Sequence, residues 1–342
     1  MILGALVINV SKYKRQLLAL DDTQLEEFVH DWVAKKIDVY VEHENFTGSG
    51  DMGRDVVGFL TEQRHEGAWH NYQCKQYNKK ITRPLALLEI GKILYYASQN
   101  QFTIPEKYYF IAPKGINRPL ETLINNPSQF KQALIDEWED CCETKIVKNS
   151  KIPLTKEVLD IINKFDFSNV KALQVTQILS DPDINSVLYK WFKHDPGVAP
   201  KGSVPQEIEN KEQEYIGQLL FAYGERLGTV FNTFKDIESH DVHFRNFKMQ
   251  RIRFYDADAF QRYYRDNTAP HTVEQIKDDI FCSIIDLCDL VSYKDTLDKI
   301  TAILGEVTKI QLSGDISLYA TNSVRQGLCH HLVNEGQLKW KI

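Results

Sequence analysis

The sequence predicts an α/β domain at the N-terminus followed by a mainly helical domain at the C-terminus. Apolar runs of strand length alternate with apolar repeats of helical spacing in the first part, whereas helical repeats dominate from Glu207 onward. The segment from Asp195 to Pro205 holds three prolines and two glycines in eleven residues, which is typical of a domain boundary. With 342 residues, the chain is long enough for two cores. We therefore expect a first domain over 1–145, a helical connector and linker over 146–204, and a C-terminal domain over 205–342.

The first domain is expected to begin with an amphipathic helix and to contain a buried strand. The helix starts at Thr23, and its apolar residues recur at helical spacing: Leu25, Phe28, Val29, Trp32 and Val33. Pro84 suits the first turn of a second helix, which extends to about Ser98. The run from Tyr108 to Ala112 has the length and composition of a buried strand. Two more helices are expected, from Arg118 or Pro119 to Ile124 and from Gln129 to Cys142.

The rest of the chain is expected to be mainly helical. Segments of the connector with helical patterns are 154–165, 170–179 and 187–192. In the C-terminal domain we expect helices over 216–230, 243–265 and 278–290, and a short strand over 316–320. The region 243–265 mixes basic and aromatic residues; their near-helical spacing favours a core helix with charged outer faces over a surface that stacks on bases.

A glycine-rich turn precedes the candidate active site. Four glycines surround Asp51 and Asp55, namely Gly48, Gly50, Gly53 and Gly58. Clustered glycine marks unusual backbone angles or the close approach of a ligand. Asp55 ends this turn and opens the apolar run Val56–Val57, the expected start of a strand that holds the carboxylate on stiff backbone.

A second strand is expected eighteen residues after Asp55, over Tyr72–Lys75. Because side chains alternate along a strand, Gln73 and Lys75 share one face, whereas Cys74 lies on the other. The sequence thus predicts a hairpin with a polar face and a buried face. The alternative is an ordinary hairpin whose Gln and Lys are simply solvated.

The stretch from Gly48 to Tyr77 resembles the active-site hairpin of the PD-(D/E)xK nuclease superfamily. Its pattern G-x-G-D-x-G-R-D followed by Q-x-K is most similar to the Mrr-like branch and to double-stranded-DNA nuclease domains of bacterial antiphage systems. The resemblance implies a restriction-endonuclease-like fold, which is a mixed sheet flanked by helices. It also implies a metal-dependent DNA endonuclease.

That resemblance assigns roles to the residues of the hairpin. Asp55 would be the fixed ligand of Mg²⁺ or Mn²⁺, the backbone carbonyl of Cys74 another ligand, and Lys75 the amine that faces the attacking water or the scissile phosphate. Gln73 stands where many members carry a second acid, and its amide oxygen can bind the metal but brings no charge. Because Mg²⁺ sites that cut phosphodiesters use one or two carboxylates plus substrate oxygens, a further carboxylate is expected from elsewhere.

Glu26 has two readings, which the sequence leaves open. In the family, the first helix often donates a glutamate to the metal, and Glu26 matches that position best. Glu26 is also the third residue after Thr23, so the two residues form a potential capping box worth about 1 kcal/mol to the helix.

A local basic stretch offsets the overall net charge of −6. Between Lys75 and Lys92 the chain carries five cations against a single acid, Glu89. Affinity for a phosphate backbone comes largely from lysine and arginine, so we expect double-stranded DNA to be contacted here by Lys79, Lys80, Arg83 and Arg54. The alternative is a solvated loop with a charged rim.

The second half carries another resemblance. The segments RIRFYDADAFQRYYRD, DDIFCSIIDL and GLCHHLVNEGQLKW resemble the C-terminal domain of effector subunits from ABC-three-component, or Lamassu, antiphage systems. Together the two resemblances suggest an LmuA-like nuclease subunit. They imply an SMC-like ABC ATPase subunit and a small bridging subunit that hold the nuclease inactive, and release followed by self-association into active dimers or tetramers.

Composition is that of an ordinary globular protein, with 43% apolar and 26% charged residues. No apolar run approaches the roughly 20 residues of a membrane span, the opening MILGALVINV lacks the basic start of a signal peptide, and the six cysteines have no disulfide or metal-knuckle spacing. We therefore expect a cytoplasmic protein with no membrane partner. Two other functions stay open: a stand-alone Mrr-like restriction endonuclease that recognises modified DNA, and a catalytically inactive DNA-binding scaffold.

Overall fold

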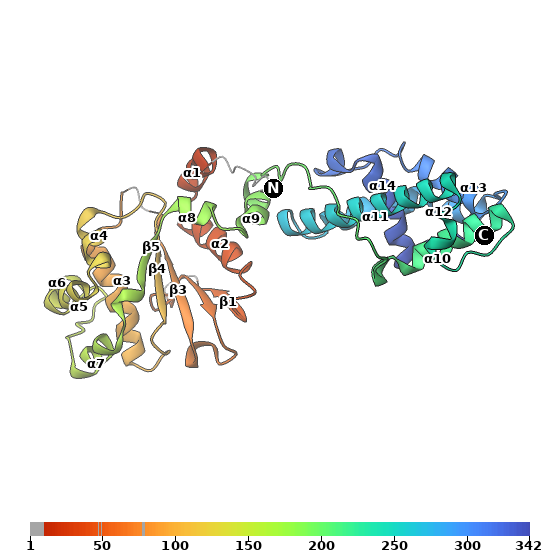
Figure 1. Cartoon of the computed structure of the whole chain (residues 1–342). Helices are drawn as coiled ribbons and strands as arrows, with labels where there is room; N and C mark the ends of the chain where they lie inside the picture. The colour runs from red at the N-terminus through yellow and green to blue at the C-terminus, as the bar shows by residue number, and fades with distance from the viewer. Residues whose placement is uncertain (1–9, 47, 49, 77–78) are drawn as a thin grey trace. The chain divides into compact units, whose positions relative to one another are not determined.

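The chain forms two compact units in a computed structural model, which describes residues 10–46, 48, 50–76 and 79–342 (Figure 1). The N-terminal unit is Met1–Lys193 and the C-terminal unit is His194–Ile342. The expectation about a signal peptide concerns residues 1–9, which lie outside the described residues. So do Thr47, Ser49, Tyr77 and Asn78 of the candidate hairpin and the loop after it.

Within the described residues, the N-terminal unit holds one mixed sheet of five strands in the order β1-β2-β3-β4-β5. The strands are β1 (Glu42–Asn45), β2 (Val56–Phe59), β3 (Trp69–Cys74), β4 (Lys107–Ile111) and β5 (Val170–Leu173). The first three strands pair antiparallel, whereas β4 and β5 run parallel to β3. The expected mixed sheet and the expected strands at 56–57, 72–75 and 108–112 are confirmed.

Helices cover both faces of this sheet (Figure 1). Phe59 of β2 and Phe110 of β4 point into one core, which is closed by α3 (Arg83–Ser98), α4 (Arg118–Asn125), α5 (Pro127–Asp136), α6 (Trp138–Cys141) and α7 (Lys156–Lys164). Tyr72 of β3 and Ile111 of β4 point into the other core, which is closed by α1 (Val10–Ala19), α2 (Asp22–Val33), α8 (Val175–Leu179) and α9 (Ile184–Phe192). The flanked sheet follows from the alternation of side chains along buried strands.

The compact units differ from the expected domains, because residues 146–193 are part of the N-terminal unit. Residues 170–173, which were expected to be helical, form β5 and pair in parallel with β4. Val170 is fully buried in the same core as α7. The boundary therefore lies between Lys193 and His194 and not near 145. The single helix expected over 129–142 is divided into α5 and α6 at Glu137.

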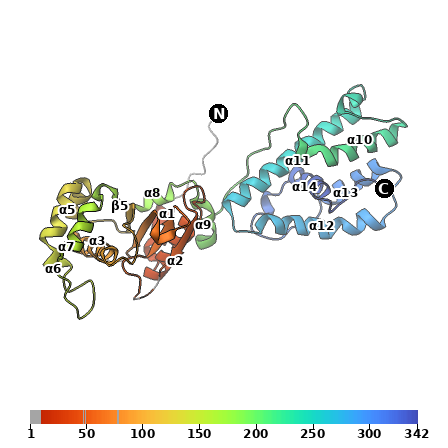
Figure 2. The same cartoon turned by 90° about the horizontal axis from the view of Figure 1, so that it is seen from below.

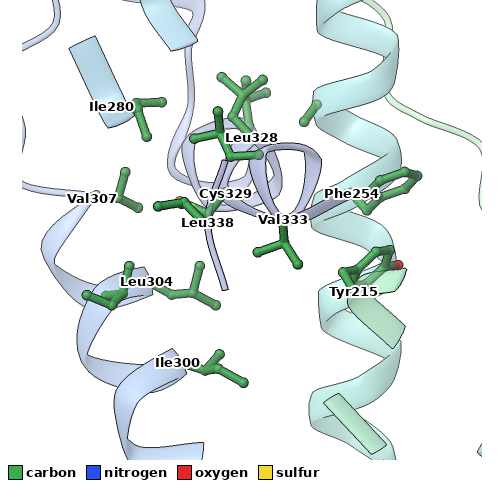
Figure 3. Packing of buried hydrophobic residues seen from close by; sticks show 14 of the residues in the cluster. Tyr215, Phe254, Ile280, Ile300, Leu304, Val307, Leu328, Cys329, Val333 and Leu338 are labelled. Carbon is green, nitrogen blue, oxygen red and sulfur yellow. The ribbon is translucent and has the colours of Figure 1, made fainter. Parts of the chain in front are cut away.

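The C-terminal unit is a helical bundle, as expected (Figure 2). Its helices are α10 (Gln213–Leu227), α11 (Asp241–Asn267), α12 (Thr272–Leu290), α13 (Thr296–Glu306) and α14 (Asn322–Asn334). Tyr215, Phe254 and Leu328 contribute to a core shared by these helices (Figure 3). Gly327 allows α14 to approach α11, because a Cβ there would lie 1.9 Å from the backbone oxygen of Arg253.

Short 3₁₀ helices complete the described chain: Arg64–Glu66, Phe167–Asn169, Asn210–Glu212, Phe234–Ile237 and Ser317–Tyr319. The strand expected over 316–320 is wrong, since this segment holds the last of these 3₁₀ helices. In the described part of the chain, no helix combines the length and apolar composition that crossing a bilayer requires.

Candidate active site

The turn before β2 is fixed on helix α3. Gly53 adopts a φ of +92°, and a Cβ at this residue would touch the backbone nitrogen of Ile93 at 3.4 Å. Asp51 accepts hydrogen bonds from the Gly53 backbone (2.9 Å) and from Lys92 Nζ of α3 (2.6 Å). The glycine therefore permits a close approach of the turn to α3, which sets the direction in which Asp55 leaves it.

Asp55 lies immediately before β2, with only 2% of its surface exposed. Val56 pairs with Tyr72 in the antiparallel register, so Asp55 and Gln73 are neighbours across the two strands. Gln73 Nε2 donates to both carboxylate oxygens at 2.8 Å, and the backbone nitrogen of Cys74 donates to Oδ2 at 2.7 Å. Three hydrogen bonds from β3 thus orient one carboxylate.

Gln73 is oriented by two buried neighbours. Its Oε1 accepts from the hydroxyl of Tyr108 on β4 (3.1 Å) and from Asn71 Nδ2 (3.4 Å). The amide nitrogen therefore faces Asp55, whereas the amide oxygen, which was expected to be a metal ligand, faces Tyr108. In this arrangement Gln73 positions Asp55 and offers no oxygen beside it. The side chain of Cys74, on the opposite face as expected, is buried in the other core.

Lys75 follows β3 and lies between two carboxylates. Its Nζ is 3.6 Å from Asp55 Oδ2 and 3.5 Å from Glu89 Oε1, and its backbone nitrogen donates to Ile111 of β4 at 2.9 Å. The acid and the amine that the sequence singles out are therefore brought together. Glu89 thus places a second carboxylate beside Lys75. The sequence predicts a further acid from elsewhere in the chain but does not identify which residue supplies it.

A signal for Glu89 does exist in the sequence. Glu89 lies in the middle of α3, where the neighbouring positions on the same side are the buried Ala86, Ile90 and Ile93. It is itself only 8% exposed. A lone acid on the apolar face of a helix is costly to bury without a partner, so its presence there indicates a charged neighbour.

The electrostatics of the cluster are set by burial. Burial raises the pKa of Asp55 to about 6; the nearby ammonium of Lys75 lowers it, but Glu89 raises it further. One ammonium therefore does not fully compensate the two carboxylates beside it. An added cation would stabilise the ionised form of Asp55.

Glu26 belongs to the same electrostatic environment. Burial raises its pKa to about 7, and Asp55 adds to this effect while Lys75 opposes it. The capping-box reading of Glu26 is wrong, because the helix starts one residue earlier: Asp21 is the N-cap and Gln24 closes the box. Glu26 thus has no capping role, and it lies one helical turn after Asp22, whose Oδ1 accepts from the backbone nitrogen of Gln76 (2.9 Å).

The donor set suits a hard cation held by few protein ligands. Asp55 and Glu89 each place a carboxylate oxygen beside Lys75 Nζ, and Mg²⁺ is commonly held by one or two carboxylates plus water and substrate oxygens. Across the residues described, no three acidic, histidine or cysteine side chains converge on a position for a metal ion. The fit therefore rests on two carboxylates, with Glu26 nearby as an electrostatic contributor.

The expected DNA-binding residues divide into two groups. Lys79 and Lys80 are exposed, whereas Arg83 forms an ion pair with Glu137 of the loop between α5 and α6. Arg54 is only 8% exposed; its guanidinium stacks on Phe46 and Phe102 and contacts His65 Nε2 at 2.8 Å. This placement gives Arg54 a role in packing and leaves it unsuited to the expected contact with DNA.

The fold and the site define an α/β unit with a buried acid–amine–acid cluster, joined to a helical unit. Residues 212–340, which make up most of the helical unit, match the family model of C-terminal domain 6 of the ABC-three component (ABC-3C) systems. The match agrees with the resemblance to ABC-three-component systems that the sequence of this half predicts. Neither the curated proteins nor the solved structures contain a match to the chain.

Proposed function

We propose that the protein is a metal-dependent DNA endonuclease that acts as the effector subunit of an ABC-three component defence system. The single observation that carries the nuclease proposal is the placement of Lys75 between Asp55 and Glu89, at 3.6 and 3.5 Å. Two carboxylates and one amine around a shared point are the groups that metal-assisted phosphodiester hydrolysis requires. The match of residues 212–340 supports the assignment to a defence system.

Each residue of the cluster has a part in the proposed reaction. Asp55 and Glu89 would hold Mg²⁺ or Mn²⁺, which when bound lowers the pKa of a water and stabilises charge on the phosphoryl oxygens. Lys75 offers its ammonium to the scissile phosphate or to the attacking water. Gln73 and the Cys74 backbone fix the direction of the Asp55 carboxylate, so that little reorganisation is needed on binding.

The C-terminal match supports the presence of partner subunits. ABC-three component systems imply an ATPase and further partner subunits. We propose that an SMC-like ABC ATPase and a small bridging subunit bind the C-terminal unit and keep the nuclease inactive. Release would then allow the effector to self-associate into a dimer or tetramer that cuts double-stranded DNA.

Plasmid cleavage by the purified full chain tests the nuclease proposal. We expect Mg²⁺-dependent nicking or linearisation that is lost in Asp55→Asn, Lys75→Ala and Glu89→Gln. Glu139→Gln provides a matched control, because it neutralises an exposed acid of the same unit that is not part of the cluster. Cleavage that persists in Asp55→Asn would show that the cluster is not the active centre.

One observation favours a second candidate, a DNA-binding scaffold without catalysis. Gln73 presents its amide nitrogen to Asp55, and the described residues hold no group of three metal-binding side chains. A scaffold would bind duplex DNA with the same affinity with or without Mg²⁺ and would leave plasmid intact at all Mg²⁺ and Mn²⁺ concentrations. Cleavage under any of these conditions excludes it.

A further inference from the structure

A pocket rich in lysine lies where the parallel strands β4 and β5 end. It has a volume of about 650 Å³. Its walls come from the turn after β4 (112–116), from β5 and the start of α8 (171–177), and from α4. Open sheets bind ligands in the crevice outside the carboxyl ends of parallel strands, so this is a favourable position for a site.

The charge of the pocket is strongly one-sided. Four ammonium groups line it, from Lys14, Lys80, Lys114 and Lys171, whereas Glu121 is the one acid among its described lining residues. In the part of the chain that the structure describes, Lys14, Lys80 and Lys171 are exposed and no ion pair to them is found. Asp166, outside the pocket, interacts electrostatically with Lys171, and Glu121 is the acid within the lining. The positive charges still outnumber the acids, so they repel one another, and this repulsion is relieved when an anion binds between them.

The backbone holds Lys80 beside the turn after β4. Ile81 donates its backbone N–H to Gly115 at 3.0 Å and accepts from the backbone of Asn117 at 2.9 Å, which forms a parallel bridge to Ile116. Gly115 has a φ of +79°, and a Cβ there would find no atom within 4 Å. The turn therefore presents open backbone to the pocket next to an anchored lysine.

The pocket lies at the same edge of the sheet as the candidate active site. The backbone of Lys75 bonds to Ile111, and the pocket begins at the next residue, Ala112. Neighbouring strands are about 4.8 Å apart, so the ends of β4 and β5 lie one to two strand spacings, roughly 5 to 10 Å, from the end of β3. Successive phosphates of one DNA strand lie farther apart than the axial rise of about 3.4 Å per nucleotide, because the strand also winds around the helix axis, so this separation corresponds to about one phosphate step.

We propose that this pocket binds a backbone phosphate of duplex DNA about one nucleotide from the bond that is cut. The choice of DNA as the source of the phosphate rests on the proposed function. Lys14, Lys80 and Lys171 neutralise the phosphate, and the pocket sets the register of the strand relative to Lys75. The contact is to the backbone and carries no base specificity.

Equilibrium binding of a fluorescently labelled duplex tests the proposal without any need for cleavage. Anisotropy is measured for the full chain in EDTA over a range of salt concentrations. Each of Lys14→Ala, Lys80→Ala and Lys171→Ala is expected to reduce the slope of log affinity against log salt by about 1, and the triple variant to bind roughly tenfold or more weakly. Lys148→Ala, at an exposed lysine outside the pocket, is the matched control and should bind like the wild type.

Two further measurements separate loss of the phosphate contact from loss of fold. The triple Lys→Arg variant keeps the positive charge and should restore the affinity and the salt slope. Circular dichroism and thermal melting of the triple Lys→Ala variant should match the wild type. The proposal is overturned if the triple Lys→Ala variant keeps the affinity and slope of the wild type. It is also overturned if a nucleoside monophosphate occupies the pocket while duplex binding stays independent of the three lysines.

The experiments distinguish failure of the phosphate-pocket inference from failure of the endonuclease proposal. If the wild type cuts plasmid, Asp55→Asn does not, and the triple Lys→Ala variant binds and cuts normally, the pocket inference alone fails. If no variant cuts under any metal condition but duplex binding still depends on the three lysines, the endonuclease proposal fails and the phosphate pocket stands.

Discussion

Each of the two units buries a charged cluster, and the two clusters are built differently. In the C-terminal unit, Glu212 is 0% exposed and accepts from Arg251 at 2.7 and 2.9 Å and from the hydroxyls of Tyr255 and Tyr215 at 2.9 and 3.1 Å. In the N-terminal unit, Asp55 forms an ion pair with Lys75 at 3.6 Å. Glu212 thus has a close bidentate partner in Arg251, whereas Asp55 shares the more distant Lys75 with Glu89.

The pKa values follow this difference. Burial alone would raise the pKa of Glu212, but the hydrogen bonds from Arg251, the Glu209 backbone and Tyr255 bring it below its ordinary value. The same effect of burial raises the pKa of Asp55 to about 6, because Lys75 compensates only in part. A buried acid that is fully paired is costly to separate from its partner, whereas an undercompensated buried acid is a candidate for binding a ligand.

The largest effect on stability is expected from breaking the paired cluster. Glu212→Gln leaves the Arg251 charge buried without a counter-charge, which should lower the free energy of unfolding of the C-terminal unit by about 3 to 5 kcal/mol. Urea denaturation followed by circular dichroism measures this change. As a control, the double variant Glu212→Leu/Arg251→Met should recover much of the loss, because apolar residues replace both charges. A change below about 0.5 kcal/mol in the single variant would contradict the comparison.

Neutralising Asp55 is expected to raise the free energy of unfolding, whereas neutralising Glu212 lowers it. The folded-state pKa of Asp55, about 6, lies above the ordinary value of 3.8, so ionisation destabilises the folded state. The contribution of Asp55 to the free energy of unfolding is most favourable below pH 3.8. It declines as the pH rises and levels off above about pH 6. Asp55→Asn should therefore stabilise the N-terminal unit at pH 7.5 by about 1 kcal/mol, less than the roughly 3 kcal/mol that two pKa units correspond to, because Asn offers Gln73 a single acceptor oxygen.

Unfolding measurements at two pH values check this prediction. The advantage of Asp55→Asn over the wild type should be present at pH 7.5 and should vanish near pH 4, where the wild-type carboxyl is protonated. Glu139→Gln serves as the control, since an exposed acid should give no such pH-dependent difference. Equal destabilisation by Asp55→Asn at both pH values would show that Asp55 is a structural acid like Glu212.

The sequence predicts the hairpin of the site because its information is local. Period-two alternation puts Gln73 and Lys75 on one face, and the apolar run after Asp55 predicts the neighbouring strand. The antiparallel register that joins these strands then follows from a short connection. For the same reason most helices of both units are recovered, whereas the mixed character of the sheet is predicted from the resemblance to a nuclease family and not from local patterns.

Features that depend on distant contacts are not predicted. Glu89 reaches the cluster only because α3 packs on the face of the sheet that carries Lys75, which sequence spacing does not reveal. Strand β5 is recognised only through its pairing with β4, since its four residues fit a helical pattern equally well. The basic stretch after β3 is less basic in three dimensions than in sequence, because Lys92 pairs with Asp51 and Arg83 pairs with Glu137.

A divalent cation is expected to stabilise the cluster around Asp55 but not the cluster around Glu212. Ca²⁺ or Mg²⁺ is expected to raise the melting temperature of the wild type, and at ten times the dissociation constant the gain is about 1.4 kcal/mol. The gain should be larger at pH 8 than at pH 5.5, because Asp55 must lose its proton to bind the ion. Asp55→Asn and Glu89→Gln should lose the effect, whereas Glu212→Gln should keep it. A shift that persists in Asp55→Asn would place the ion elsewhere.

The smallest expected effect separates the two readings of Glu26 by experiment. Because the cap of α2 is formed by Asp21 and Gln24, Glu26→Gln should leave helix stability unchanged, whereas Gln24→Ala should lower it by about 0.5 to 1 kcal/mol. The pKa of Glu26, about 7, lies above that of Asp55, about 6, so Glu26 is largely neutral where Asp55 ionises, and Glu26→Gln should leave the acid limb of the cleavage–pH profile nearly unchanged. Gln24→Ala should not move that limb. If Glu26→Gln instead abolished cleavage at every pH without changing its pH dependence, Glu26 would be a direct ligand of the metal and not an electrostatic neighbour of the acid that holds it.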